Sequence, residues 1–484
     1  MYDSRHNRGN AGGGAIPVAV ACTGAFLAFL DATIVNIAFP DISASFSGSS
    51  RAALSWVLDG YFVVIAALLL PAGGLADRFG HRRIFGFGVA IFTLASALCA
   101  AAPTLATLIA ARVVQGVGAA LIVPASLALV LDRFPTERRA AGVGLWGAAA
   151  AAAAAVGPTL GGVLVELADW RLVFVVNLPL GAAVLLAARR RLSEISAPLA
   201  RTPDLPAAAM LAVALGLVTL GIVEGNDWGW DGRPTLACFA LGALLLAAVA
   251  ARARTHPRPL LEPALFAHAS FRAGNLGTLL FSAAFFSLIL GNVLFLTGVW
   301  GYTVLQAALA SLPSPILSTL IAGPAGALAD RFGHRVVIVP GTVVFALGVM
   351  VLRASGAEPD YFGTWLPGAC MVGVGIGLAF PTLGSAAVRD VAVDRFATAS
   401  AVNAAFRQVG AVLGTALLVA IVGEPVGRDE SLSAADRGYL FAALASLAAG
   451  VPALMLRPAP APAPEPEPAP TTAAPASPSP GRSA

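Results

Sequence analysis

The sequence predicts an all-α polytopic membrane protein, with two six-helix bundles and a central two-helix hairpin. Three observations predict this fold class. Hydrophobic residues make up 58% of the chain and charged residues 12%, whereas soluble domains carry about 25% charge. Fourteen apolar runs are long enough to cross a bilayer as helices. The octapeptide Leu-Ala-Asp-Arg-Phe-Gly-His-Arg at residues 75–82 recurs letter for letter at residues 328–335.

Each copy of the octapeptide lies between two long apolar runs. A charged segment in this position predicts a tight loop that joins two membrane helices at one face of a bilayer. Two copies at equivalent places predict two related halves. Repeated halves are a frequent plan of secondary transporters.

The apolar runs follow one another in a regular order, and each is near the roughly 20 residues that a spanning helix needs. The first six are residues 15–39, 54–76, 84–102, 104–131, 140–166 and 170–188. Two more, 205–223 and 234–251, lie between arginine-rich linkers and form the hairpin. The last six are residues 273–297, 302–328, 336–353, 361–387, 398–422 and 437–456.

These runs give the domain organisation. It consists of an N-terminal tail at 1–14, a first six-helix bundle at 15–188, linkers and hairpin at 189–258, a second bundle at 259–456, and a C-terminal tail at 457–484. The first tail is polar and Gly-rich, and the second alternates Pro with Ala, Glu and Ser. Neither composition can form a packed core, so we expect both tails to be disordered cytoplasmic segments.

The arginines predict the orientation of the chain. With the N-terminus in the cytoplasm, 22 arginines fall in cytoplasmic loops and tails and 6 in external ones. This asymmetry follows the positive-inside rule and predicts that both termini are cytoplasmic. Because the hairpin adds two crossings, both bundles keep the same orientation, as in parallel repeats.

The residue types that do not occur in the sequence restrict the chemistry that the protein can perform. All thirty basic residues are arginine, so the chain has no lysine for a P-loop or a Schiff base. The four cysteines fall in apolar runs without metal-like spacing. We expect no cofactor, no metal and no enzymatic activity. The expected partners are the lipid bilayer, protons and a small hydrophobic substrate, and not nucleic acid.

Ionisable residues inside a membrane are costly and usually functional. Asp31 and Arg112 each lie eight residues from the outer end of a predicted helix, roughly 12 Å deep at 1.5 Å per residue. They are therefore expected to meet and to form a proton-coupling pair. The alternative is a purely structural pair, or an Asp31 side chain that only joins helices. Asp59 and Glu166 lie nearer to the outer helix ends.

Other polar or aromatic residues on these helices are candidates for a substrate cavity. They are Asn36, Gln115, Trp146, Asn292 and Arg407. Gln115 lies one turn from Arg112 on the same helix face. Interhelical hydrogen bonding or packing is the alternative role for each of them.

Two segments are candidates for gating. Gly157, Pro158 and Gly161 weaken one helix, which predicts either a kink for packing or a bending element.

The octapeptide regions are the second segment, and their candidate gating residues are Gly73, Asp77, Arg78, Gly80, Arg82, Asp330 and Arg331. We expect Asp77 to accept hydrogen bonds from the N-terminus of a neighbouring helix, and the arginines to anchor the loop. Topological anchoring alone is the alternative. We interpret His81 and His334 as solvated loop residues.

With these residues in place, the chain resembles the fourteen-helix drug:proton antiporter family of the major facilitator superfamily. Five segments carry the resemblance: residues 73–83 for the loop 2–3 signature, 30–38 for helix 1, 112–120 for helix 4, 157–162 for helix 5 and 170–179 for helix 6. His81 stands where the signature usually has Arg or Lys, and Ala153 replaces the first glycine of the helix 5 motif.

The resemblance implies a major facilitator fold and proton-coupled export of hydrophobic compounds across the plasma membrane of a bacterium by alternating access. It implies that Asp31 carries the proton, that Arg112 modulates it, and that Asp77 and Arg78 control the inner gate. It also implies a monomer.

Two other functions remain open. The chain could transport a single metabolite in either direction on the same fold, or act as a membrane sensor or scaffold without transport. Arg407 and the scarcity of acidic residues within the last six runs favour neutral or anionic substrates over dications.

Overall fold

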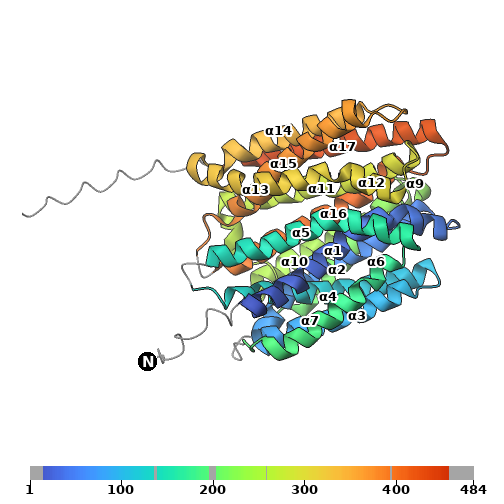
Figure 1. Ribbon diagram of the computed structural model, residues 1–484. Coiled ribbons are helices and arrows are strands. Elements are labelled where there is room, and N and C mark those ends of the chain that lie inside the picture. The colour runs from blue at the N-terminus through green and yellow to red at the C-terminus, as the bar shows by residue number, and fades with distance from the viewer. Residues whose placement is uncertain (1–14, 136–138, 196–202, 258, 393–394, 457–484) are drawn as a thin grey trace, which may run out of the picture.

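The computed structural model describes residues 15–135, 139–195, 203–257, 259–392 and 395–456. Within these ranges every regular element is a helix, and Figure 1 shows the long helices running alongside one another. The two predicted tails lie outside the described residues.

The helices follow the predicted order. The first half contains α1 (Ala15–Ser45), α2 (Arg51–Phe79), α3 (His81–Ala100), α4 (Leu105–Leu131), α5 (Arg139–Leu167), α6 (Leu172–Val175) and α7 (Asn177–Arg191). The hairpin contains α8 (Leu205–Val223), α9 (Gly225–Trp228) and α10 (Arg233–Thr255). The second half contains η2 (Pro263–Ala267), α11 (Ala269–Gly298), α12 (Val304–Ser311), α13 (Pro313–Phe332), α14 (His334–Arg353), η3 (Tyr361–Trp365), α15 (Leu366–Val388), α16 (Phe396–Val422) and α17 (Arg428–Ala453).

Thirteen of the described helical segments are long and apolar enough to cross a membrane. The fourteenth predicted run, 437–456, falls mainly on α17, a 26-residue helix that packs against α11 and α14. Its lower hydropathy has a simple cause, because it begins with Arg428, Asp429 and Glu430, contains Asp436 and Arg437, and is rich in Ala, Gly and Ser. The first helix is longer than predicted, since α1 continues through Pro40 to Ser45.

The octapeptide forms the same turn in both halves. α2 ends at Phe79 and α13 at Phe332, and a glycine follows each of them, with φ of 103° at Gly80 and 92° at Gly333. This conformation favours glycine, because a Cβ atom would clash there. We call the end of the bundle that holds these two turns the octapeptide end, and the end where α2 begins the Arg51 end.

The two histidines correct a prediction. His81 and His334 are 9% and 8% exposed, so they are not solvated loop residues. Each is the first residue of the helix after the turn, α3 or α14, and is buried there. The sequence places them beside charged residues, but the tight glycine turn directs them inward.

Small residues bring the helices into close contact in both halves. A Cβ atom on Gly118 of α4 would lie 2.6 Å from the backbone nitrogen of Phe92 on α3. In the second half, a Cβ atom on Gly375 of α15 would meet the backbone of Phe345 on α14 in the same way. Such contacts between small residues are the main means of helix association where lipid removes the hydrophobic driving force.

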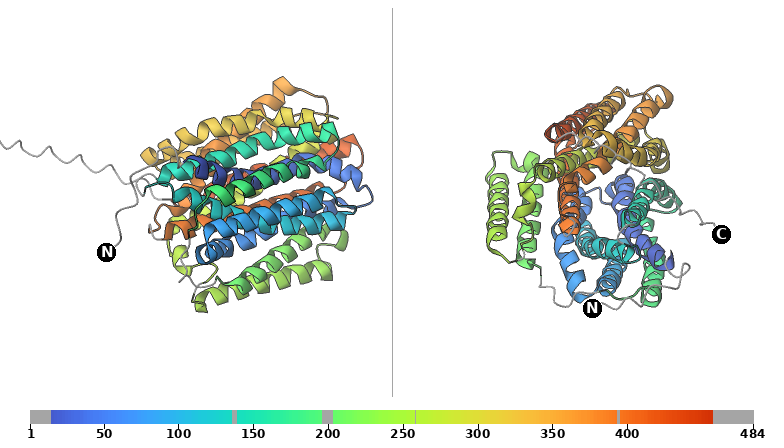
Figure 2. Two further views of the ribbon diagram at one scale, coloured as in Figure 1. Left: turned by 60° about the horizontal axis from the view of Figure 1, so that its bottom comes forward. Right: turned by 90° about the vertical axis from the view of Figure 1, so that its left-hand side faces the viewer.

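The hairpin lies beside both halves rather than between them. Figure 2 shows it outside the two bundles, next to α16, and α8 packs against α2 and α16. Asp204 caps α8 and accepts hydrogen bonds from Arg252 of α10 at 2.7 and 2.9 Å, which ties the two hairpin ends together. The α9 turn is held by Asn226, whose amide donates to the Ala420 carbonyl at 2.7 Å.

The close α3–α4 contact predicts the effect of one substitution. Gly118→Val forces the two backbones apart, and overpacking of this kind costs about 1–3 kcal/mol. We expect a lower Tm in detergent for Gly118→Val. Gly147→Ala on α5 is the matched control, because no atom lies within 4 Å of its added Cβ. An unchanged Tm for Gly118→Val would contradict the contact.

Candidate functional site

A buried ion pair lies in the core of the first half. Asp31 on α1 and Arg112 on α4 are both 0% exposed, and the Nη1 of Arg112 donates to the Oδ2 of Asp31. The structure therefore places Asp31 and Arg112 in contact, as their equal depth in the predicted helices indicates.

Three amide and hydroxyl side chains complete the network around Asp31. The Nε2 of Gln115 donates to the Oδ1 of Asp31 at 2.8 Å, and the Nδ2 of Asn177 on α7 donates to the same oxygen at 3.0 Å. Both amides also donate to the Oγ of Ser96 on α3, at 2.8 and 3.3 Å. All three side chains are 0% exposed. The network therefore joins α1, α3, α4 and α7.

Helix α2 holds the other side of Arg112. The Nε of Arg112 donates to the Val57 carbonyl at 2.8 Å, and its guanidinium lies 4.1 Å from the ring centroid of Tyr61. The Tyr61 hydroxyl donates to the Ala28 carbonyl of α1 at 3.0 Å. A cation over a desolvated aromatic face is favourable by about 2 kcal/mol, so Tyr61 and Arg112 position one another.

The cost of burying two charges explains why several side chains surround the Asp31–Arg112 pair. Removing a charge from water costs several kcal/mol per ion, and attraction offsets this only with good geometry and further hydrogen bonds. Asp31 has an opposite charge and two amide donors, while the Nη2 of Arg112 and the Oδ1 of Asn177 have no partner among the described residues. The network is therefore well satisfied at the carboxylate and less so at its edges.

The predicted cavity residues do not form one group. Gln115 belongs to the buried network. The Nε1 of Trp146 donates to the Ser126 hydroxyl at 2.9 Å, and its ring packs against Phe29. Asn36 is 2% exposed and donates to the Ala32 carbonyl of its own helix at 2.9 Å.

Two predicted cavity residues lie in the second half. Asn292 on α11 has a buried carbonyl oxygen with no partner among the described residues. Arg407 on α16 is half-buried, and its guanidinium lies 5.9 Å from the ring centroid of Phe380 on α15. Within the described residues it forms no ion pair, in contrast to Arg112.

Among the described residues, the first octapeptide has a carboxylate partner that the second lacks. The carboxylate of Glu194, in the segment after α7, accepts from the backbone N–H of Arg82 at 3.0 Å and lies 3.6 Å from the Nε of Arg83. The His81 N–H donates to the Ile195 carbonyl at 2.9 Å.

The second octapeptide has different contacts. His334 pairs with the hydroxyl of Ser385 on α15 at 3.1 Å, and Val336 stands where the first copy has Arg83. Asp330 and Arg331 are exposed.

Asp77 lies beside its own turn. Its carboxylate is 58% exposed and 3.2 Å from the Nε2 of His81. The expected hydrogen bond to a neighbouring helix N-terminus does not occur among the described residues. Arg78 lies over the ring of Phe79, just as Arg331 lies over Phe332.

The predicted weak helix, α5, is assigned as one α-helix through Pro158. Its glycines lie against α1 just beyond Asp31. A Cβ atom on Gly157 would lie 3.1 Å from the Cβ of Thr33, and one on Gly161 would lie 2.8 Å from the Cγ1 of Ile34. The motif therefore forms the surface on which α5 contacts α1.

The sequence-based candidates did not include four residues of these networks, which are Tyr61, Ser96, Asn177 and Glu194. Ser96 is one of two hydroxyl residues, with Thr93, in an Ala- and Leu-rich run, and Glu194 is the carboxylate that lies nearest to the three arginines at 189–191. Glu194 had a detectable signal, because an isolated acid among arginines near the predicted octapeptide end invites an ion pair. Ser96 had none.

The repeated helical halves and the buried ion pair define the class of polytopic membrane transporters. The chain belongs to the Major Facilitator Superfamily, whose family model matches residues 21–314 and, a second time, residues 274–483. The two matches agree with the two copies of the octapeptide.

Known proteins of this kind are similar over most of the chain. The Multidrug resistance protein Stp of Mycobacterium tuberculosis is 34% identical over 82% of this chain and 74% of its own length. The Methylenomycin A resistance protein of Streptomyces coelicolor is 32% identical over 92% and 93%. A bacterial homolog of the human lysosomal transporter Spinster, in an inward-facing conformation, has the same fold, with a TM-score of 0.64, 17% identity and coverage of 92% and 98%.

The buried pair predicts a non-additive mutational cycle. Asp31→Leu leaves Arg112 charged and buried without its partner, which typically costs about 3–5 kcal/mol. We expect Asp31→Leu and Arg112→Leu each to lower the Tm strongly. The double variant should recover most of the loss, because no unpaired charge remains. Additive losses in the double variant would show that the two residues do not interact.

The octapeptide contacts predict an asymmetry between the halves. Glu194→Gln removes the charge that holds Arg82 and Arg83 and should increase amide hydrogen exchange at residues 80–83. Ser385→Ala, which removes the partner of His334, is the matched change in the second half, where we expect a smaller effect because no ion pair is lost. Equal effects in both loops would contradict the assignment.

Proposed function

We propose that the chain is a proton-coupled antiporter that exports hydrophobic drugs or antibiotics across a bacterial plasma membrane by alternating access. The observation that carries the proposal is the Asp31–Arg112 pair, fully buried inside an apolar bundle. A charge pair is a costly way to hold helices together. Relatives named for multidrug and methylenomycin A resistance support the proposal that the chain is an exporter.

The pair offers a way to couple a proton to a conformational change. When Asp31 is ionised, it neutralises Arg112 and links α1 to α4 and α7 through its hydrogen bonds. When Asp31 is protonated, the attraction to Arg112 weakens and one acceptor position becomes a donor. The two protonation states therefore favour different packings of α1 against α4, which is what a switch requires.

Alternating access requires a contact that opens at each end. At the Arg51 end, Arg51 of α2 joins the halves through hydrogen bonds to Gly423 and Glu424. At the octapeptide end, Asp77, Arg78 and Glu194 are the proposed gating residues. In this proposal the octapeptide end and both termini face the cytoplasm, and the transporter acts as a monomer.

Arg407 supports a substrate preference. Phe380 lies between it and an aromatic cluster that includes Phe281 and Phe285. Arg407 has no carboxylate partner in the described part of the chain, so it attracts an anionic or acceptor-rich group, and the aromatic rings suit an apolar body. Neutral or anionic aromatic compounds are therefore better candidates than dications. A transporter of one dedicated metabolite remains the second candidate, and the same feature would serve it.

The coupling experiment uses reconstituted vesicles with an imposed pH gradient. We expect the native protein to move a fluorescent lipophilic anion or a neutral dye against its gradient, and Asp31→Asn to abolish uphill movement, because Asn cannot exchange a proton. Glu166→Gln, which removes an exposed carboxylate at the end of α5, is the matched control and should transport normally.

The outcomes separate the candidate functions. Equal uphill transport by Asp31→Asn would make Asp31 structural and would overturn the coupling site. If no dye moves in the native protein, the polyspecific exporter fails, and a single dedicated substrate or a non-transporting sensor or scaffold takes its place.

A further inference from the structure

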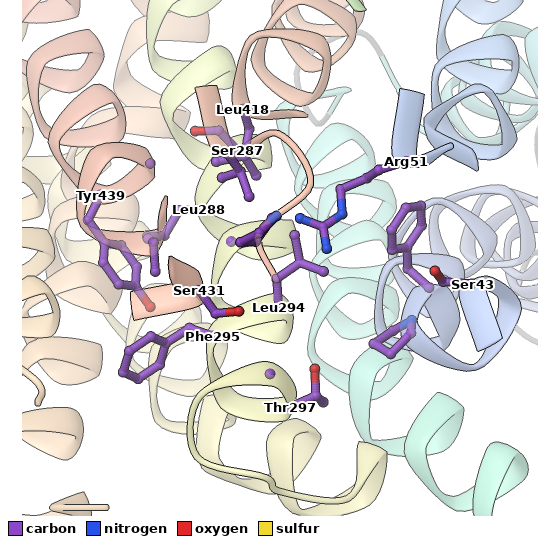
Figure 3. Close-up of a pocket in the computed structure, with 18 residues that line it drawn as sticks. Ser43, Arg51, Ser287, Leu288, Leu294, Phe295, Thr297, Leu418, Ser431 and Tyr439 are labelled. Carbon is purple, nitrogen blue, oxygen red and sulfur yellow. The ribbon is translucent and has the colours of Figure 1, made fainter. Parts of the chain in front are cut away.

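A cavity of about 210 Å³ lies between the two halves at the Arg51 end. Helices α1 and α2 of the first half line one side, and α11, α16 and α17 of the second half line the other. Figure 3 shows Arg51 directed into this space from the first half and Tyr439 facing it from the second half, with Ser431 between them. The cavity is distinct from the Asp31 network, and none of the network residues lines it.

The Arg51 guanidinium is positively charged, and most of its N–H donors have no partner among the described residues. It donates to the Gly423 carbonyl at 2.8 Å, which is its one side-chain hydrogen bond among the described residues. A guanidinium has five N–H donors. The nearby Glu424 carboxylate accepts from the backbone N–H of Arg51 at 2.7 Å and forms no ion pair with the guanidinium in the described part of the chain. Most of the fork therefore remains free for an anion.

Tyr439 gives an independent indication of a ligand. The residue is 3% exposed, and its hydroxyl has no hydrogen-bond partner among the described residues. Buried polar groups are nearly always satisfied, so an orphan hydroxyl beside a cavity needs an explanation. A molecule in the cavity that accepts a hydrogen bond would supply the missing partner.

The other residues that line the cavity indicate the size and polarity of the rest of the ligand. Ser287, Thr297 and Ser431 already donate their hydroxyl protons to backbone carbonyls of their own helices, so they offer acceptor lone pairs only. Apolar residues, including Leu294 and Leu418, cover much of the rest. The volume is below the roughly 300–1,000 Å³ of pockets for drug-sized ligands, so the occupant must be small.

We propose that this cavity binds a small carboxylate with an apolar ring, with Arg51 holding the carboxylate and Tyr439 donating a hydrogen bond to it. Because its walls come from both halves, a bound molecule stabilises the arrangement in which the halves touch at the Arg51 end. A ligand that binds one state of an equilibrium shifts the population toward that state. Occupancy therefore inhibits transport by holding this end closed, a consequence that rests on the proposed function, whereas the binding itself does not.

The binding test uses the full-length protein in nanodiscs and benzoate as the probe. Saturation-transfer NMR or calorimetry should detect benzoate, and should detect neutral benzamide and cationic benzamidinium at least about ten-fold more weakly, which is 1.4 kcal/mol. Arg51→Gln should raise the Kd for benzoate about ten-fold or more, and Tyr439→Phe several-fold. Arg233→Gln is the matched control, because Arg233 is an exposed cation at the same end of the molecule that does not line the cavity.

A second variant keeps the test informative if Arg51→Gln misfolds. Gly291 lines the cavity on α11, and a Cβ atom there would lie 3.8 Å from Leu418 in ordinary contact. Gly291→Leu should therefore fill the space and abolish benzoate binding while Arg51 remains. Binding that survives Gly291→Leu, or equal binding of benzoate and benzamide, would overturn the site.

The effect on transport separates this proposal from the proposed function. Benzoate should slow dye efflux by the native protein but not by Gly291→Leu. Benzoate binding without slower efflux would overturn the locking step while leaving the site. Failure of the Asp31→Asn experiment would overturn proton coupling without altering any binding result.

Discussion

The burial of one ion pair in an apolar bundle is the constraint on which the first half depends. Arg112 is charged at any physiological pH, so wherever α4 packs, its guanidinium needs a carboxylate and acceptors. Asp31 supplies the charge, the Val57 carbonyl supplies one acceptor, and the Tyr61 ring covers one face. Helices α1 and α2 are thereby fixed against α4 around one group. A change at that group is transmitted to these three helices directly, and to α3 through Ser96, which bonds to Gln115 and Asn177.

The two halves share a backbone plan but differ in polar content. Each has the octapeptide turn with a left-handed glycine, and each has a glycine that brings adjacent helices into contact. The second half has a neutral network in place of an ionic one, in which the amide of Asn403 donates to Asn275 and Thr278 at 3.1 and 3.0 Å. A neutral network needs no charge compensation and does not respond to a proton. This division suits coupling in one half and substrate contact in the other.

Much of this organisation follows from patterns that the sequence carries. Hydropathy predicts the helices because a spanning segment must satisfy its backbone internally, and α17 has a weaker signal because five charged residues lie between Arg428 and Arg437. The pairing of Asp31 with Arg112 follows from their equal depth, although the boundary used for α1 was six residues short of Ser45. Ser96 was not predictable, because one hydroxyl among many small residues has no periodic or charge signal. The inward direction of His81 and His334 depends on the turn geometry, which alternation of charge does not reveal.

The sequence by itself determined the helical membrane class, the twofold repeat, and which few ionisable residues must find partners, because the cost of burying charge in lipid leaves few alternatives. The Asp31–Arg112 contact apart, only the tertiary structure decided what those partners are. It placed Asn177 and Ser96 on Asp31, Glu194 on the first octapeptide, and Arg51 and Tyr439 around one cavity. The physical reason is that hydrogen bonds and cavities depend on helix rotation and approach to within an ångström. Hydropathy indicates only the number, the order and the approximate length of the helices.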